Sequence, residues 1–158
     1  MATNAAGVLR RLQAQKRDLT MKPIDGVTIS WPDNNVRKWL VQIYGPTGSL
    51  YENDIFDVQI IFGPDYPEKP PRLIMNTPIV HPNVDTNGAV CIDVLRSQYN
   101  KVVTVRQIIE GIINALEHPN EKGRLNAQVG DLMVRDMAAF EEKARKQVAI
   151  NVMKRAEQ

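Results

Sequence analysis

The stretch IFDVQIIF, residues 55–62, carries the clearest structural signal in the sequence. Every second residue from Phe56 to Phe62 is apolar, whereas Asp57 and Gln59 between them are polar. An alternation with a period of two predicts a β-strand that buries one face and exposes the other. Such a strand belongs to a sheet whose apolar side needs a cover.

The same alternation recurs in shorter runs on either side of this strand. Apolar and polar residues alternate over 27–31 and 39–43, and a fourth short run covers 72–76. Pro-Asp-Asn-Asn at 32–35 and Gly-Pro-Thr-Gly at 45–48 separate the first three runs, and both are typical of turns. Because short connections permit only antiparallel neighbours, the sequence predicts a four-stranded antiparallel meander.

Helical periodicity precedes the predicted sheet. A helix over residues 4–20 would place Val8, Leu12 and Leu19 on one face. Arg10 lies nearly opposite them, on a face that is mainly basic. Two interpretations stay open: a solvated outer face, or a docking surface for an acidic protein.

Three helices are predicted after the sheet. Thr-Val-Arg-Gln at 104–107 fits a capping box, and the helix behind it carries a wide apolar stripe that ends before Pro119. That helix is the natural cover for the meander. Two further helices are predicted over 129–140 and 142–156, the first with Met137 and Phe140 on its apolar face.

We therefore expect one α+β domain over residues 1–158: an N-terminal helix, the meander, a central covering helix and two C-terminal helices. The chain has 158 residues, 43% hydrophobic and 24% charged, which is ordinary for a globular domain and excludes a disordered or fibrous chain. It has no apolar run of membrane-spanning length and no signal-peptide pattern, so we expect a cytosolic or nuclear protein and no membrane contact.

Composition also limits the chemistry. One cysteine forbids an internal disulfide, and with only two histidines besides it we expect no metal site. The sequence has no phosphate-binding loop, its net charge is +2, and aromatic residues do not interleave with a basic patch. We accordingly expect no cofactor and no nucleic-acid partner.

An irregular, proline-rich region follows the predicted strands and holds the reactive group. Six of the ten prolines lie between Pro64 and Pro82, and Tyr66–Pro67 is the best candidate for a cis bond. Residues 80–103 show no long periodic segment, which in a compact domain is usually functional.

Cys91 lies within that irregular stretch, after the polar turn 85–88. A lone cysteine is more often a buried packing residue, but one placed in such a loop is more often exposed and able to act as a nucleophile. Asn83, eight residues upstream, offers an amide N–H of the kind that stabilises an oxyanion.

Several runs together resemble the ubiquitin-conjugating enzyme family. His81-Pro82-Asn83, followed by Cys-Ile-Asp-Val-Leu at 91–95, resembles the active-site signature of that family. Phe-Gly-Pro-Asp-Tyr-Pro-Glu-Lys-Pro-Pro at 62–71, Tyr-Gly-Pro at 44–46 and Arg-Ser-Gln-Tyr at 96–99 also match, in collinear order. The family fold agrees with the predicted order of elements.

The resemblance implies a two-step acyl transfer. Cys91 would take ubiquitin from an activating enzyme as a thioester and pass it to a lysine of a target protein, usually with a ligase. Asn83 would stabilise the oxyanion or hold the loop in shape, and Asp93 would orient or deprotonate the incoming amine. His81 and Pro82 would be structural.

The resemblance also implies surfaces for partners, and the sequence departs from the family pattern there. Arg10 and Arg11 match positions that meet the activating enzyme and ligases. Glu68 stands where many members have Phe, and Asn100-Lys101-Val102 stands where many have Ser-Pro-Ala, so ligase choice cannot be carried over. These residues are predicted to contact partners, and a monomer is the default expectation.

Another departure lies in the loop after the central helix. Counting from Pro119-Asn120, Gly123 stands where many members carry an acid or a serine near the catalytic cysteine. This leaves open which group lowers the pKa of the amine. Glu121 is the nearest acid in sequence, but its position relative to Cys91 cannot be predicted.

Three alternatives differ from a ubiquitin-conjugating enzyme. The modifier could be a different ubiquitin-like protein, although the spacing from Cys91 to Thr104 is the shorter one of ubiquitin-type members. The chain could also be a non-catalytic scaffold of the same fold, which the presence of Cys91 disfavours. A nucleic-acid-binding module would rely on the N-terminal basic stripe and show strong salt dependence.

Overall fold

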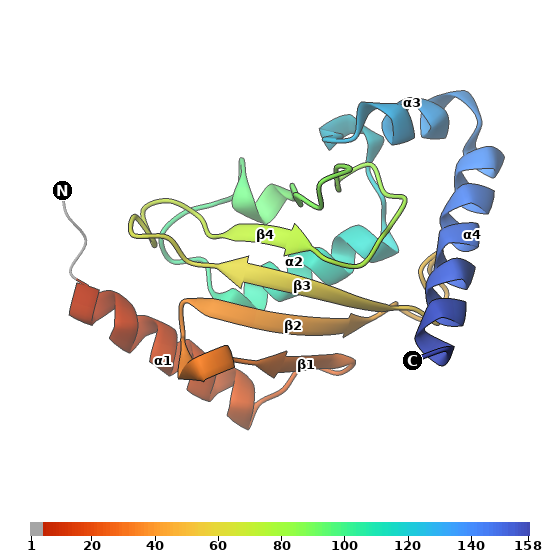
Figure 1. Ribbon diagram of the computed structural model, residues 1–158. Helices are drawn as coiled ribbons and strands as arrows, with labels where there is room; N and C mark the ends of the chain where they lie inside the picture. The colour runs from red at the N-terminus through yellow and green to blue at the C-terminus, as the bar shows by residue number, and fades with distance from the viewer. Residues whose placement is uncertain (1–4) are drawn as a thin grey trace.

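The computed structural model describes residues 5–158, and it confirms the predicted α+β fold. Asn4, where the first helix was predicted to begin, lies outside the described residues. Figure 1 shows one sheet with helices around it. In chain order the helices and strands are α1 (Ala5–Met21), β1 (Val27–Ser30), β2 (Lys38–Tyr44), β3 (Ile55–Ile61), β4 (Arg72–Met75), α2 (Val105–Glu117), α3 (Ala127–Arg135) and α4 (Met137–Ala156).

The sheet is the predicted antiparallel meander, with strand order β1-β2-β3-β4. Trp39 pairs with Ile60, and Val58 pairs with Met75, so residues of one face stay in register across three strands. The inward side chains of β2, β3 and β4 are almost completely buried. They pack against α2, which crosses behind the strands in Figure 1.

The sequence of α2 explains its boundaries. The Thr104 side chain accepts a hydrogen bond from the Gln107 backbone N–H, and the Gln107 side chain accepts one from the Thr104 backbone N–H. This is the predicted capping box. The apolar stripe of α2 is buried against the sheet, and α1 contacts the start of α2 because Arg106 pairs with Asp18 at 3.1 Å.

The two C-terminal helices divide at Asp136, so the predicted boundary near 140–142 is wrong. Asp136 ends α3, and its side chain accepts a hydrogen bond from the Ala139 N–H to cap α4. Phe140 therefore belongs to α4, where it is buried, whereas Met137 is half exposed rather than part of an apolar face of α3. A side-chain cap outweighs apolar periodicity at this boundary because it satisfies backbone donors that the helix start leaves unpaired.

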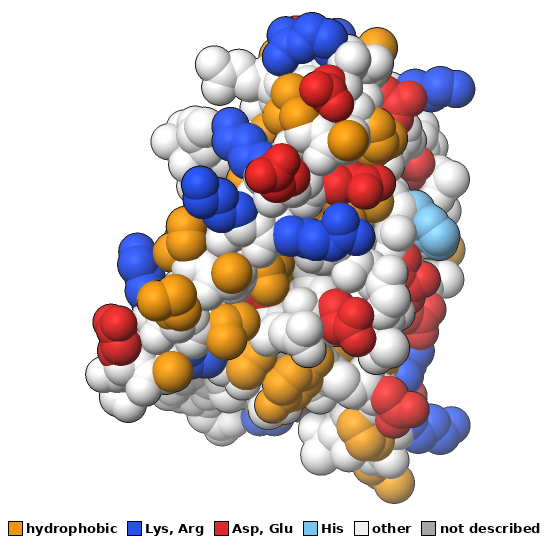
Figure 2. Space-filling view, turned by 90° about the vertical axis from the view of Figure 1, so that its right-hand side faces the viewer, with side chains coloured by type: hydrophobic (Ala, Val, Ile, Leu, Met, Phe, Trp, Pro, Cys, Tyr) orange, Lys and Arg blue, Asp and Glu red, His pale blue; other side chains and the backbone are white. Residues whose placement is uncertain are grey.

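The outer surface of α4 is unusually apolar near its end. Ile150, Val152 and Met153 are exposed there, and Figure 2 shows hydrophobic side chains gathered on this side of the molecule. Within residues 5–158, no helix combines the length and the hydropathy needed to cross a membrane.

The opposite face of α4 is anchored to the end of the sheet by a buried carboxylate. Asp54, in the β2–β3 connection, accepts hydrogen bonds from the Ile55 N–H at 2.8 Å and the Asn151 amide at 2.8 Å. It also pairs with Arg155. The Asp54 side chain has no exposed area, so these partners replace the water that the charge loses on folding.

Replacing Asn151 with Ala should therefore destabilise the fold. The change leaves part of a buried carboxylate without a donor, and the expected loss in the free energy of unfolding is about 2–3 kcal/mol. Urea denaturation at neutral pH measures it. Ile150→Ala, a truncation on the exposed side of the same helix, is the control, and equal losses in the two variants would contradict the buried-network explanation.

Candidate active site

Cys91 lies in the long connection between β4 and α2, and a tight turn positions it. The Asp85 carboxylate accepts hydrogen bonds from the Asn87 and Ala89 N–H groups, both at 2.9 Å. Gly88 has a φ of +89°, and a Cβ on it would lie 2.4 Å from the Met75 carbonyl oxygen, so only glycine fits this turn. The turn returns the chain so that the Cys91 N–H donates to the Asn83 carbonyl at 2.9 Å.

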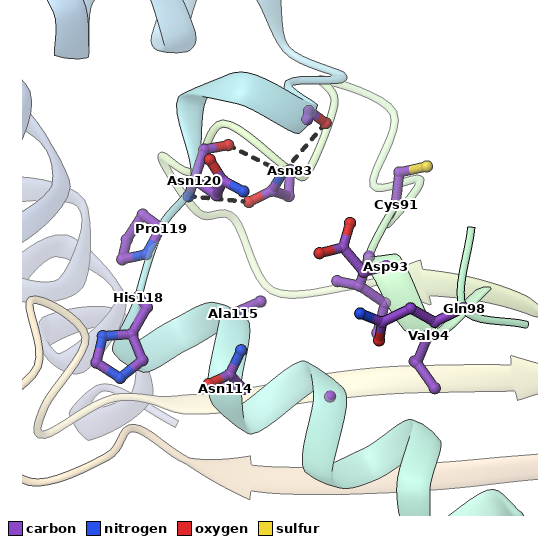
Figure 3. A pocket seen from close by; sticks show the side chains of 13 residues that line it. Asn83, Cys91, Asp93, Val94, Gln98, Asn114, Ala115, His118, Pro119 and Asn120 are labelled. Carbon is purple, nitrogen blue, oxygen red and sulfur yellow. Dashed lines mark hydrogen bonds between the residues drawn. The ribbon is translucent and has the colours of Figure 1, made fainter. Parts of the chain in front are cut away.

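The Cys91 thiol is free and half-buried, at the edge of an open groove of about 420 Å³. We call this hollow the amide groove, because four amide side chains line it: Asn83, Gln98, Asn114 and Asn120. Figure 3 shows Asn83 and Asn120 on one side of the groove and Asp93 and Gln98 on the other. The Cys91 sulfur points away from Asn83 and from α2, so it lies on a rim rather than at the bottom of the groove.

The Asn83 amide is fully engaged with the loop after α2. Its Nδ2 donates to the carbonyls of Asn120 and Gly123, each at 3.2 Å, and its Oδ1 accepts from the Asn120 N–H at 3.4 Å. The residue is only 7% exposed. In this geometry the amide holds the 120–123 segment in place, and both of its N–H groups already have acceptors.

His81 is buried and bonded through both ring nitrogens. Its Nε2 lies 2.6 Å from the Ala115 carbonyl oxygen, and its Nδ1 accepts from the Asn83 N–H at 2.9 Å. The Tyr51 ring packs on it with centroids 5.5 Å apart. Burial lowers the pKa of His81 from its ordinary 6.5 to about 4, although the bond to Ala115 favours the protonated ring.

Pro82 completes a continuous clamp. Its carbonyl oxygen accepts hydrogen bonds from the N–H groups of Leu125 and Asn126, both at 2.9 Å. Each of the three residues 81–83 is therefore hydrogen-bonded to the segment 115–126, which consists of the end of α2 and the loop that follows it. We call residues 81–83 the clamp. It fixes the cysteine loop to the central helix.

Among residues 5–158, Asp93 is the one carboxylate that lines the amide groove. It is exposed and begins a 3-10 turn, Asp93–Leu95. Glu121, the acid nearest to Gly123 in sequence, does not line the groove. A Cβ on Gly123 would lie 3.8 Å from the Asn83 amide nitrogen, which is an ordinary contact, so the glycine leaves room where a side chain would fit.

The residues predicted to contact partners lie around a junction between α1, the 62–71 segment and the segment before α2, and Tyr66 is at its centre. Its hydroxyl accepts hydrogen bonds from Arg11 and Gln15 of α1, and the Tyr66–Pro67 bond is cis as predicted. Tyr99 donates to the Pro67 carbonyl, which joins the 62–71 segment to the segment before α2. Glu68, Asn100 and Lys101 are exposed around this junction.

The two arginines of α1 differ in environment. Arg10 is exposed, whereas Arg11 is half-buried and donates to both Tyr66 and the Val103 carbonyl. The guanidinium of Arg11 also lies 5.6 Å from the centre of the Tyr66 ring. Arg11 therefore supports the junction from within, and Arg10 is the arginine of the pair that is free to meet another protein.

Arg96 is a site residue to which the sequence analysis assigned no role. Its guanidinium donates to the Gly123 carbonyl at 3.3 Å, beside the bond from Asn83. The contact spans 27 positions in the chain, and no periodicity or motif predicts it. In residues 5–158, no three His, Cys, Asp or Glu side chains are grouped to hold a metal ion.

This fold, in which a partly exposed cysteine follows a His-Pro-Asn clamp in the sequence, defines the ubiquitin-conjugating class of α+β domain. A family model for ubiquitin-conjugating enzymes matches residues 11–148. The chain belongs to the ubiquitin-conjugating enzyme family.

Named relatives agree with this assignment. The chain is 34% identical to a probable ubiquitin-conjugating enzyme E2 31 of Arabidopsis thaliana, over 75% of this chain and 77% of that protein. It is 33% identical to a ubiquitin-conjugating enzyme E2-20 kDa of Schizosaccharomyces pombe, over 86% and 78%. Among solved structures, a ubiquitin-conjugating enzyme E2 domain of Toxoplasma gondii matches with a TM-score of 0.80 at 28% identity, covering 90% of this chain and 97% of that one.

The environment of His81 predicts a pH dependence of stability. The folded state favours the neutral ring, whereas the unfolded chain takes up a proton below about pH 6.5. The stability that His81 contributes is thus complete above pH 6.5 and is lost as the pH falls toward 4. A pKa difference of this size corresponds to about 3 kcal/mol.

Urea denaturation between pH 7 and pH 4 tests this assignment. His81→Gln should be less stable than the parent at pH 7 but should lose less stability on acidification. His118→Gln, at an exposed ring, should keep the steep dependence of the parent. A His81→Gln variant whose stability falls as steeply as that of the parent would show that another group titrates.

Proposed function

We propose that the protein is a ubiquitin-conjugating enzyme that carries ubiquitin as a thioester on Cys91 and transfers it to a lysine of a target protein. The observation that carries this proposal is the free, half-buried thiol on the edge of an open groove, with its backbone N–H held by the clamp residue Asn83. The family membership and the fold support the same conclusion.

The proposed reaction has two balanced steps. The Cys91 thiolate attacks the thioester carbonyl at the ubiquitin C-terminus, and the thiolate of the activating enzyme leaves. The lysine amine of the target then attacks the new thioester, loses its proton, and expels the Cys91 thiolate. Neither step needs a metal or a bound cofactor, because the energy of the activated carbonyl is kept in the thioester itself.

Asp93 is the group we assign to the incoming amine. It lines the amide groove on the wall beside Cys91, and no other carboxylate lines that groove within residues 5–158. A carboxylate there favours the approach of an amine and can accept its proton. Asn83 acts by holding the 120–123 segment against the site, since its amide already serves two carbonyls.

Partner contacts are assigned to the region around Tyr66. Arg10 offers an exposed cation on α1, and Glu68, Asn100 and Lys101 are exposed beside it. We assign this surface to the activating enzyme and to a ligase. The exposed charge of Glu68 favours a ligase with a polar or cationic patch over one that buries an aromatic anchor. We place the enzyme in the cytosol or nucleus and treat it as a monomer.

A charging assay tests the assignment of Cys91. Mixed with activating enzyme, ATP and ubiquitin, the protein should form an adduct that reductant removes on a gel. Cys91→Ser should form an oxyester that resists reductant, because an alkoxide leaves less readily than a thiolate. The proposal fails if no adduct forms, or if one forms with another ubiquitin-like modifier but not with ubiquitin.

Asn83→Ala tests the role of the clamp amide. Loading should stay measurable, whereas discharge of the isolated thioester onto free lysine should slow about 10²-fold, because displacement of the site segment misplaces the reacting groups. Hydrogen exchange across residues 120–126 should rise in the same variant if the amide acts by holding this segment. Unchanged exchange with slow discharge would instead indicate a direct oxyanion donor, and Asn87→Ala, in the exposed turn, is the matched control.

A further inference from the structure

A second groove lies on the other side of Cys91 and is separate from the amide groove. It has a volume of about 290 Å³ and runs between β4 and the cysteine loop. Its exposed apolar surface comes from Pro70, Ile74, Val90 and Leu95, whereas Leu73, which also borders it, is buried in the core. We call it the β4 groove. Of the residues that the structure describes, Cys91 alone lines both grooves, so it stands on the ridge between them.

The backbone explains why the β4 groove opens where it does. The segment 88–90 pairs with the free edge of β4, through Met75 N–H to Gly88 at 2.7 Å and Val90 N–H to Leu73 at 3.3 Å. Beyond Leu73, toward Arg72 and Pro71, this pairing stops among residues 5–158, and the Cys91 N–H bonds to Asn83 instead. The groove is therefore built from ordered backbone and does not depend on a mobile loop.

The charge of the β4 groove is one-sided. Arg72 and Arg96 are the two charged residues among those that line it, and both are exposed. In the part of the chain that the structure describes, neither arginine forms an ion pair with an acid. Arg96 uses one N–H on the Gly123 carbonyl, which leaves other donors of its guanidinium available.

The two grooves therefore suit different polypeptides. Apart from the engaged Asn83, the amide groove offers the carboxamides of Gln98, Asn114 and Asn120 and the Asp93 carboxylate, and carboxamides pair with the main chain of an extended segment whatever its side chains. The β4 groove offers an apolar floor and two unpaired guanidinium groups, which pair with carboxylates. Figure 3 shows the Cys91 sulfur turned away from Asn83, and Cys91 also lines the β4 groove.

We propose that the β4 groove binds an acidic segment of the acceptor protein, with carboxylates against Arg72 and Arg96 and the accepting lysine directed at Cys91. This inference rests on the proposed function and adds a substrate class to it: lysines flanked by acidic and apolar residues. The tail of ubiquitin then lies along the amide groove, and the lysine amine crosses the ridge at Cys91 toward Asp93. Because both arginines are exposed, the preference is electrostatic and weakens in salt.

Single-turnover discharge of the isolated ubiquitin thioester tests the proposal. The acceptors are three short peptides that share one lysine and the same apolar residues, flanked by Asp and Glu, by Gln, or by Arg. Discharge should be fastest onto the acidic peptide and slowest onto the basic one, by about tenfold at low salt, with the difference collapsing near 0.5 M NaCl. Arg72→Glu should reverse the order, so that the basic peptide becomes the best acceptor.

The control is Lys146→Glu, which makes the same change of charge on the exposed side of α4 and should keep the parental order. Equal rates for the three peptides, or an equal reversal in Lys146→Glu, would overturn the proposal. So would an Arg72→Glu variant that slows loading of ubiquitin without changing the order of the peptides, since the groove would then serve the modifier. If no thioester forms on the parent protein, the proposed function itself fails, which is a distinguishable result.

Discussion

The site depends on one constraint: an irregular chain segment must be held against a helix end without leaving buried polar groups unpaired. The clamp meets this requirement with three consecutive residues, each of which bonds to the segment 115–126 by a different group. An imidazole, a backbone carbonyl and a carboxamide together pair with backbone donors and acceptors of that segment, which the regular hydrogen bonding of a helix or sheet does not reach. Cys91 takes its position from this arrangement, because its own N–H bonds to the clamp.

Most of the fold could be predicted because its elements are specified locally. Strand β3 and helix α2 carry strong periodicity, and the capping box at Thr104 is a signal within four residues. The boundary between α3 and α4 could not be placed, because α4 also carries exposed apolar side chains near both of its ends, Met137 at the start and Ile150, Val152 and Met153 toward the end. On such a helix the apolar periodicity does not show where the helix begins, and the cap at Asp136 decides the boundary instead.

The candidate site was predictable in its residues and less so in their contacts. Cys91 and Asn83 stand out by type and by the motif around them, but the partners of Asn83 lie 37 and 40 positions away. Arg96 reaches Gly123 across 27 positions, and Arg11 reaches Val103 across 92. Such contacts depend on how elements pack, so the sequence could not show that Arg11 is half-buried while Arg10 remains exposed.

The environment of the clamp also limits the chemistry of the site. His81 is the histidine nearest in sequence to Cys91, yet both of its nitrogens are engaged and burial lowers its pKa to about 4. It cannot take a proton near neutral pH without breaking the bond that holds Asn83. In the proposed reaction, proton removal therefore falls to Asp93 rather than to His81. In this reaction the absence of a free imidazole base from the clamp would let the thioester persist while it is carried, and a partner that orders the acceptor would then set the rate of transfer.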